Sequence, residues 1–367
     1  GYAFMKMLLG ALGYDAEVEQ YTGANWSINV AKRALNIGLD DDLVGDFNGI
    51  KAVNREEACL YALNTLTADM VEYDAKTTVS TNGTTVVIAG SKAKEMVNNG
   101  NTDGKVFDKD GVMQFAEKYF DNLTVKTGSD DFARPANVWK LKAEEIGTYT
   151  NTPDATYTKK VENGDIYKDL GLGSKIEAKD VSVYEDGVKK TNTVAIEKGD
   201  DTKVGNSGNG VLTEVFYDDD ADTVTVTQIN TYVGSINKTV KATDKKDAYV
   251  VVTAEGPVPS QGFDNEFETD EKFEDDAYVL YTYSLTAKEI KSVEAAKKVE
   301  GTVTVAENSK TDLDEKKALT IDGTRYKAAV KVGGEDIGEV SVKQDYTIYL
   351  DSYGYMIYVE ENEEIGD

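Results

Sequence analysis

The residues best suited to metal chemistry form one acidic run. Asp218, Asp220 and Asp222 alternate in the D-x-D-x-D order with which an EF-hand calcium loop begins. The run then departs from that loop, because Thr223 stands at the position of the glycine and Ile229 at that of the bidentate glutamate. Strand-like residues flank it on both sides. We therefore predict an acidic hairpin turn, with calcium left open as a counterion and no cofactor expected.

The residue types of the chain give little support for an enzymatic function. The chain has no histidine, the commonest general base and metal ligand at neutral pH. Its only cysteine, Cys59, falls on an apolar helical stripe and is predicted to be a small buried hydrophobe rather than a nucleophile. Paired carboxylates can hydrolyse glycosides, but 67 acidic residues supply many such pairs by chance. We predict a non-catalytic protein.

The length and the net charge of the chain limit its domain organisation and the classes of partner that it can bind. A chain of 367 residues can bury several cores. Its net charge of −27 argues against a nucleic-acid partner, since binding to a phosphate backbone needs a basic face. The apolar run from Met5 to Leu12 is shorter than the ~18 residues of a membrane-spanning helix, so no span is predicted.

Residues 1–74 predict a module of three short helices. The first helix ends at Gly13, and the second runs from Trp26 to Gly38. Asn54 is a good N-cap for the third helix, and Glu57 follows three residues later, where the two residues form a reciprocal capping box. The apolar stripes of the three helices are Met5, Leu8, Leu9 and Leu12; Val30, Ala31, Ala34 and Leu35; and Cys59, Leu63, Leu66 and Met70.

The order of short motifs in this module resembles an S-layer homology (SLH) repeat. The motifs are Gly23-Ala24-Asn25-Trp26, Asn29-Val30-Ala31, Asn36-Ile37-Gly38-Leu39 and Asn54-Arg55-Glu56-Glu57-Ala58. The last of them stands where the family has a Thr-Arg-Ala-Glu-type motif that opens a helix. The segment from Phe4 to Asp15 resembles the closing helix of a preceding repeat. The resemblance covers about the first fifth of the chain, and it implies a fragment or processed form that begins inside a repeat.

The resemblance also implies a ligand. SLH modules hold an anionic secondary cell-wall polysaccharide in grooves between repeats. By position, Arg55 would pair with the anionic substituent through its planar fork of donors. Trp26 would stack on a sugar or support the groove, and Asn54 and Glu56 complete the motif. Asn54 departs from the family's threonine. The competing interpretation makes Trp26 a core anchor and Arg55 a partner in a surface ion pair with glutamates.

Beyond residue 74 the pattern predicts mainly strands. We expect a mixed α/β connecting domain at 75–177, with a hairpin turning at Asn82-Gly83. Two β-rich domains follow, at 178–255 and 275–367, the second ending in a hairpin around Asp351-Ser352-Tyr353-Gly354. The segment Gly256 to Asp276, which holds two prolines, is the best linker candidate, and no internal repeat is evident.

The fold class expected is therefore multidomain α+β, with an N-terminal short-helix SLH-like module followed by mostly antiparallel, sandwich-like β domains. The expected function is that of an extracellular, S-layer-type protein of the bacterial cell surface. It would bind wall polysaccharide through residues 1–74 and form an outer structural or lattice layer by self-association of its β domains. The alternative is a surface adhesin whose β domains bind a host protein or glycan. Lattice formation on adding calcium would favour the first, and a saturable host ligand the second.

Overall fold

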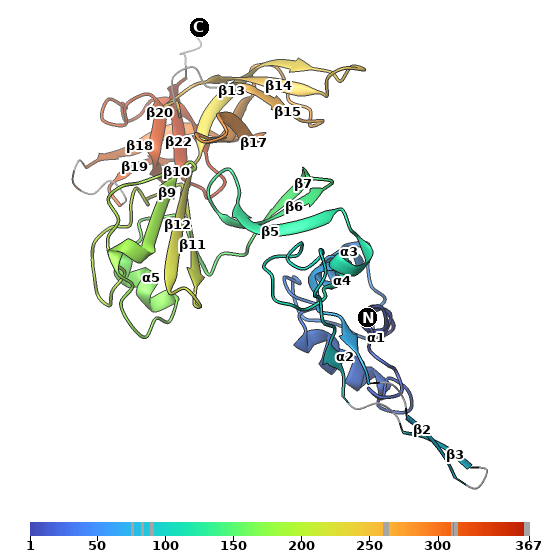
Figure 1. The fold of residues 1–367 in the computed structure, drawn as a ribbon. Helices are drawn as coiled ribbons and strands as arrows, with labels where there is room; N and C mark the ends of the chain where they lie inside the picture. Colours follow the sequence, from blue (N-terminus) through green and yellow to red (C-terminus); the bar gives the residue numbers. More distant parts are fainter. Residues whose placement is uncertain are drawn as a thin grey trace. The chain divides into compact units, whose positions relative to one another are not determined.

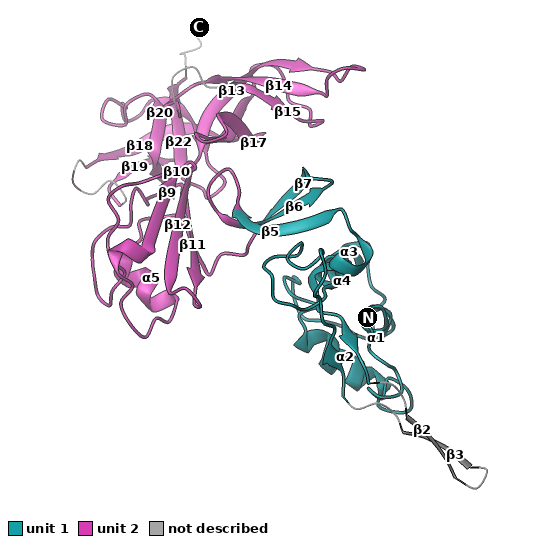
Figure 2. Cartoon of the chain, in the orientation of Figure 1, with its two compact units in different colours: residues 1–128, 136–149 teal, residues 129–135, 150–367 magenta. Residues whose placement is uncertain are grey.

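The chain is mostly β, with several separate sheets and a smaller helical part, in agreement with the expected α+β class. The computed structural model (Figure 1) describes residues 1–74, 77–81, 84–88, 92–259, 264–309, 311 and 315–362. These residues form two compact units (Figure 2). Unit 1 comprises residues 1–128 and 136–149, and unit 2 comprises residues 129–135 and 150–367. The expected division into four domains stays a prediction.

Unit 1 begins with the three predicted helices, α1 (Tyr2–Ala11), α2 (Trp26–Asn36) and α3 (Arg55–Thr67). Gly13 and Gly38 follow the first two at φ +103° and +70°, the left-handed conformation that lets a helix end. The capping box of α3 is formed. The Asn54 Oδ1 accepts from the Glu57 amide at 2.8 Å, and the Asn54 amide donates to the Glu57 Oε2 at 2.9 Å.

The helices share one core, but α3 contributes to it with an unexpected face. Met5, Leu9 and Leu12 of the first predicted stripe are buried in this core. From α3, Tyr61 is buried in this core, whereas Leu63 and Leu66 pack against a second cluster that contains Val125 and Trp139. The remaining face of α3 points to solvent. Cys59 lies on that face and is exposed, so its predicted burial is wrong.

The rest of unit 1 consists of short elements. They are β1 (Val71–Glu72), β2 (Thr77–Thr81), β3 (Thr84–Ile88), β4 (Lys94–Glu95), α4 (Phe115–Tyr119), β5 (Leu123–Ser129), β6 (Pro135–Leu141) and β7 (Glu144–Thr150). Strands β2 and β3 pair as the predicted hairpin, and its turn residues Asn82 and Gly83 lie outside the described residues. Strands β5, β6 and β7 form a three-stranded sheet in that order.

Unit 2 opens with a five-stranded sheet in the order β10-β9-β12-β11-β8. Its elements are β8 (Ala155–Tyr157), α5 (Asn163–Asp169), the 3-10 turn Ala178–Asp180, β9 (Val181–Glu185), β10 (Val188–Lys189), β11 (Val211–Asp218) and β12 (Thr223–Asn230). Strands β9 and β12 are parallel, and the other neighbours are antiparallel. One core joins Val161 and Ile166 to Val181, Val215 and Val226. It therefore draws on residues from both sides of position 177.

The second sheet of unit 2 has the order β15-β14-β13-β16-β17. Its strands are β13 (Tyr232–Val240), β14 (Tyr249–Ala254), β15 (Glu266–Glu268), β16 (Tyr278–Ser284) and β17 (Glu289–Ala295). The predicted linker from Gly256 to Asp276 therefore joins strands of one sheet rather than two domains. Its first residue is packed, because a Cβ on Gly256 would lie only 3.2 Å from the Gly333 Cα.

The C-terminal strands close a barrel in the order β18-β19-β20-β22-β21. They are β18 (Lys297–Asn308), β19 (Lys317–Ile321), β20 (Thr324–Gly334), β21 (Asp345–Leu350) and β22 (Met356–Glu361), and β21 and β22 form the predicted hairpin. The first half of β18 pairs with β21 and the second half with β19. This long strand turns the sheet back on itself, which gives a barrel where a sandwich was expected.

Candidate functional site

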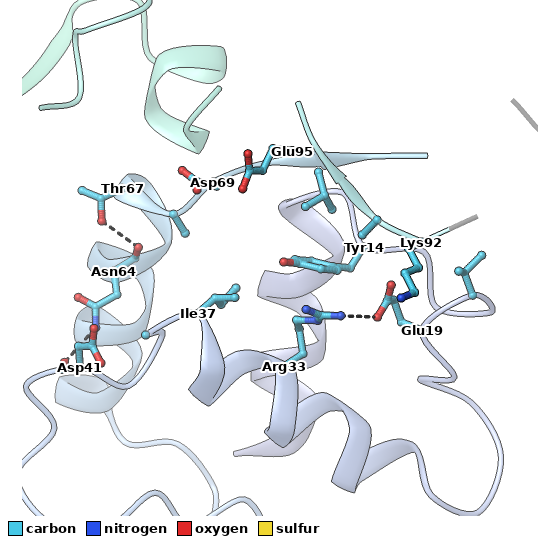
Figure 3. A pocket seen from close by; sticks show the side chains of 15 residues that line it. Tyr14, Glu19, Arg33, Ile37, Asp41, Asn64, Thr67, Asp69, Lys92 and Glu95 are labelled. Atoms are coloured by element: carbon cyan, nitrogen blue, oxygen red, sulfur yellow. Dashed lines mark hydrogen bonds and ion pairs between the residues drawn. The ribbon is translucent and has the colours of Figure 1, made fainter. Parts of the chain in front are cut away.

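A groove of about 1040 Å³ with polar walls lies beside the helices of unit 1. It lies between the C-terminal half of α2 and helix α3, and the segment that contains β4 borders it (Figure 3). Its main polar residues are Tyr14, Glu19, Arg33, Asp41, Asn64, Thr67, Asp69, Lys92 and Glu95. A volume near the upper end of the range of ligand pockets, about 300–1,000 Å³, suits an extended ligand.

Arg33 organises one end of the groove. It stands in the last turn of α2, where the helix dipole favours a cation. Its Nη2 lies 3.1 Å from the Glu19 Oε2, and its guanidinium carbon is 5.2 Å from the centre of the Tyr14 ring. The hydroxyl of Tyr73 donates to the other Glu19 oxygen at 2.9 Å. Burial opposes the charge of Arg33, but its contacts with Glu19 and the tyrosines outweigh burial and raise its pKa.

The tyrosines at this end are neutral at physiological pH. Burial, with the nearby Glu19 carboxylate, raises the pKa of Tyr21 to about 12. Burial also raises the pKa of Tyr14, although the positive charge of Arg33 opposes that change. The groove therefore takes its charge from its carboxylates and its two cations alone.

Asn64 organises the opposite end. Its side-chain nitrogen donates to the carbonyls of Asp41 at 3.0 Å and Leu39 at 3.3 Å. These bonds tie α3 to the loop that follows α2. The Thr67 hydroxyl donates to the Asn64 carbonyl at 3.1 Å, one turn further along α3. Figure 3 shows Asn64, Asp41 and Thr67 facing Arg33, Glu19 and Tyr14 across the groove, with Ile37 between them.

The charge balance limits what the groove can hold. Its lining has four carboxylates, Glu19, Asp41, Asp69 and Glu95, against the two cations Arg33 and Lys92. Arg33 is already paired with Glu19. A dense polyanion would meet a net negative wall, whereas carboxylates, amides and hydroxyls are good partners for sugar hydroxyls. The groove therefore suits a hydroxyl-rich ligand of low charge density.

The four residues predicted from the motif lie elsewhere in the helical module. None of Trp26, Asn54, Arg55 and Glu56 lines the groove. Trp26 is half-buried, with the Tyr2 ring edge-on at 6.3 Å and the Lys6 Nζ at 5.5 Å from its ring. Asn54 uses its side chain in the capping box. Arg55 and Glu56 are exposed on the first turn of α3. A glycan-binding role for these four stays a prediction.

The groove residues were missed because they come from separate segments. Arg33 and Asn64 stand on different helices, and neither belongs to the motif that drew notice to Arg55. One signal was available. The chain has only four arginines, Arg33, Arg55, Arg134 and Arg325, so each of them merits a structural explanation.

The acidic run that suggested calcium is the turn between β11 and β12. Asp218 pairs with Thr223 across it, and the Asp218 Oδ1 accepts from the Ala221 amide at 2.9 Å. The Tyr217 hydroxyl donates to Asp222 at 3.0 Å. Among the residues that the structure describes, no three acidic or cysteine side chains are grouped to hold a metal ion.

Comparison with protein families, curated proteins and solved structures found no match for the chain. No helix in the described ranges is both long and apolar enough to cross a membrane. The features of the chain that bear on its function are the motifs of the helical module and the geometry of the groove beside it.

Proposed function

We propose that the chain is a non-catalytic, extracellular protein of the bacterial cell surface, of the S-layer type. Its helical module binds a wall polysaccharide, and its β modules form an outer structural layer. The observation that carries this proposal is the groove between α2 and α3, about 1040 Å³ in volume and lined by hydrogen-bonding side chains. Most of the groove lining comes from the segment whose motifs resemble an SLH repeat, and Lys92, Ala93 and Glu95 complete it from beyond that segment.

The proposal places the ligand in the groove rather than at Arg55. A saccharide is recognised by several hydrogen bonds to fixed polar groups, and the groove offers such groups on both walls. Asn64 and Arg33 are held by their own contacts, so little order is lost when a ligand binds. Lys92 and Glu95 are exposed at the rim. The saccharide expected there is rich in free hydroxyls and carries few charges.

Pelleting with wall sacculi tests the proposal, using sacculi with and without their secondary polysaccharide. The double variant Lys92→Ala/Glu95→Ala alters the groove, and Arg55→Ala/Glu56→Ala is its matched control. Each variant removes one cation and one carboxylate, all exposed, so the net charge stays constant. We expect the groove variant to bind about tenfold more weakly, ~1.4 kcal/mol, and the control to bind like the parent protein.

If Arg55→Ala/Glu56→Ala weakens binding and Lys92→Ala/Glu95→Ala does not, the binding site lies at the motif residues. Equal binding to both kinds of sacculi by the folded parent protein would remove the anchoring function. Saturable binding of a host protein or glycan by a monomer without wall binding would favour the adhesin.

A further inference from the structure

Strand β7 is a free edge of its sheet. In the three-stranded sheet β5-β6-β7 it is one of the two outer strands, and no described strand pairs with its free side (Figure 1). An edge strand presents unpaired amide and carbonyl groups, which are a template for pairing with another chain. β7 has seven residues and no proline. The edge strands of the first sheet of unit 2, β8 and β10, have only three and two.

Apolar side chains accompany this edge. Ile146 and Tyr149 of β7 are 57% and 55% exposed, and Leu141 at the end of β6 is 44% exposed. Natural proteins protect long edges with charged side chains, lysine above all, with proline, or by keeping the strand very short. β7 is long and has neither lysine nor proline, and its only charges, Glu144 and Glu145, stand together at one end. The position of these two charges decides which partner strand fits.

We propose that β7 pairs with β7 of a second copy of this chain, antiparallel about a two-fold axis at Gly147. With full overlap Gly147 faces its own copy, and Ile146 lies opposite Thr148. Glu144 lies opposite Thr150 and Glu145 opposite Tyr149, so no glutamate faces another. Parallel pairing in register would set each glutamate against itself, which destabilises a sheet. The antiparallel arrangement is also the one that a closed, isologous dimer requires.

The two sheets then become one six-stranded sheet, β5-β6-β7 continued by β7-β6-β5 of the second copy. Ile146 and its copy become diagonal neighbours on one face of this sheet, and Tyr149 covers the backbone of the pair on the other face. The net charge of −27 on each chain opposes association. Salt screens this repulsion, so the dimer strengthens as ionic strength rises. Such a dimer supplies one contact between copies in the proposed surface layer. Only this role in a layer rests on the proposed function.

Cysteine crosslinking in full-length protein tests the register. The native thiol is removed by Cys59→Ser, and Gly147→Cys or Glu144→Cys is added. Opposed residues in an antiparallel pair have Cα atoms about 4.5–5.5 Å apart, within disulfide range. Glu144 lies six residues from its own copy along the pair, ~20 Å. A Cβ on Gly147 meets only the far end of the exposed Tyr149 ring, at 3.0 Å. We expect disulfide-linked dimer from Gly147→Cys alone.

Sedimentation of otherwise native variants supplies the second measurement. Tyr149→Glu sets a glutamate opposite Glu145 of the other copy and should abolish the dimer, whereas Tyr149→Thr should retain it more weakly. A native chain that stays monomeric at high salt, or equal crosslinking of both cysteine variants, would overturn the proposal. So would capture of a foreign strand in place of a second copy. At a dilution at which the parent is also monomeric, wall pelleting of Tyr149→Glu should match that of the parent, so this proposal and the anchoring function fail separately.

Discussion

The second sheet and the barrel of unit 2 are two versions of one topology. In each, the first strand pairs with the fourth near its start and with the second toward its end. In the sheet, β13 pairs with β16 and then β14; in the barrel, β18 pairs with β21 and then β19. The order of strands around the barrel is 1-2-3-5-4.

The two versions differ in closure. In the barrel the third and fifth strands, β20 and β22, pair in parallel and close the sheet. In the sheet the equivalent strands, β15 and β17, are not hydrogen-bonded neighbours. β20 has eleven residues, whereas β15 has three, two of them glutamates. One order of pairing therefore gives an open module, without a hydrogen-bonded closure, or a closed one, and the closed module is the one with the longer third strand.

Both modules attach to the first sheet of unit 2 through the turn between their fourth and fifth strands. In the open module the Leu285 amide donates to the Asp186 carbonyl at 2.8 Å. In the barrel the Asp351 carboxylate packs against Gly210, where a Cβ would lie 2.4 Å from Oδ2. A buried aspartate thus stands at each attachment, and the two differ in how well they are hydrogen-bonded.

Breaking the closure of the barrel should have the largest effect. Gly334 lies at φ +76°, and a Cβ there would stand 1.9 Å from the Val359 carbonyl oxygen of β22. We expect Gly334→Ala to lower the free energy of unfolding by about 4 kcal/mol, since backbone must move. Gly354→Ala is the control, because its φ is also positive but its Cβ meets nothing, and it should cost about 1 kcal/mol. Denaturant unfolding followed by circular dichroism measures both, and equal losses would contradict the closure argument.

The Asp351 carboxyl should make the barrel attachment sensitive to pH. Its Oδ1 accepts from the Tyr353 and Tyr355 amides, and Oδ2 has no hydrogen-bond partner among the described residues. Burial, opposed by these amides and aided by Glu294, raises its pKa from 3.8 to about 6. The folded state holds this proton more tightly than the unfolded chain.

The protonated Asp351 carboxyl therefore makes its full contribution to the free energy of unfolding below about pH 4. This contribution, up to ~3 kcal/mol, is lost as the pH rises through about 6. Asp351→Asn keeps an oxygen for the amides and cannot ionise. We expect the variant to be more stable than the parent at pH 7.5, with the advantage gone at pH 4. Unfolding curves across this range measure it, and an unchanged pH dependence would refute the assignment.

The equivalent change in the open module should have the opposite sign. The Asp186 Oδ2 accepts from the Asn230 side chain at 2.9 Å and the Tyr232 hydroxyl at 2.7 Å, and Oδ1 accepts from the Asn230 amide at 2.9 Å. Burial raises the pKa of Asp186 against these bonds. Asp186→Asn would turn an NH₂ group toward a donor, which should cost about 2 kcal/mol at pH 7. A neutral or stabilising effect at that pH would show that the two attachments are alike.

The smallest expected effect tests whether the two modules are packed together. The Cβ of Gly256→Ala would lie 3.1 Å from a Val233 methyl group and 3.2 Å from the Gly333 Cα. We expect a loss of about 1 kcal/mol, since both neighbours must shift slightly. Gly173→Ala, whose Cβ meets nothing, is the control and should be neutral. If both substitutions are neutral in thermal unfolding, residue 256 behaves as the linker that the sequence indicated.

Features that depend on near neighbours in the chain were predicted well. The capping box of Asn54 and Glu57, the helix ends at Gly13 and Gly38 and the hairpin of β21 and β22 were all predicted from the sequence. Each depends on backbone groups only a few residues apart, so residue type decides it. The acidic turn after Asp218 belongs to the same class.

Features that depend on distant segments were not predictable in this way. The topology shared by the two modules depends on strand pairs that are far apart in the sequence, such as Lys297 with Leu350. The residues around either strand do not indicate which strand it will pair with. The exposure of Cys59 follows from α3 packing against two cores rather than one. The groove exists only where α2 and α3 meet and bring Arg33 opposite Asn64. Sequence therefore decided where the chain turns and where helices begin and end. Packing between remote segments decided which strands pair and which polar residues face one another.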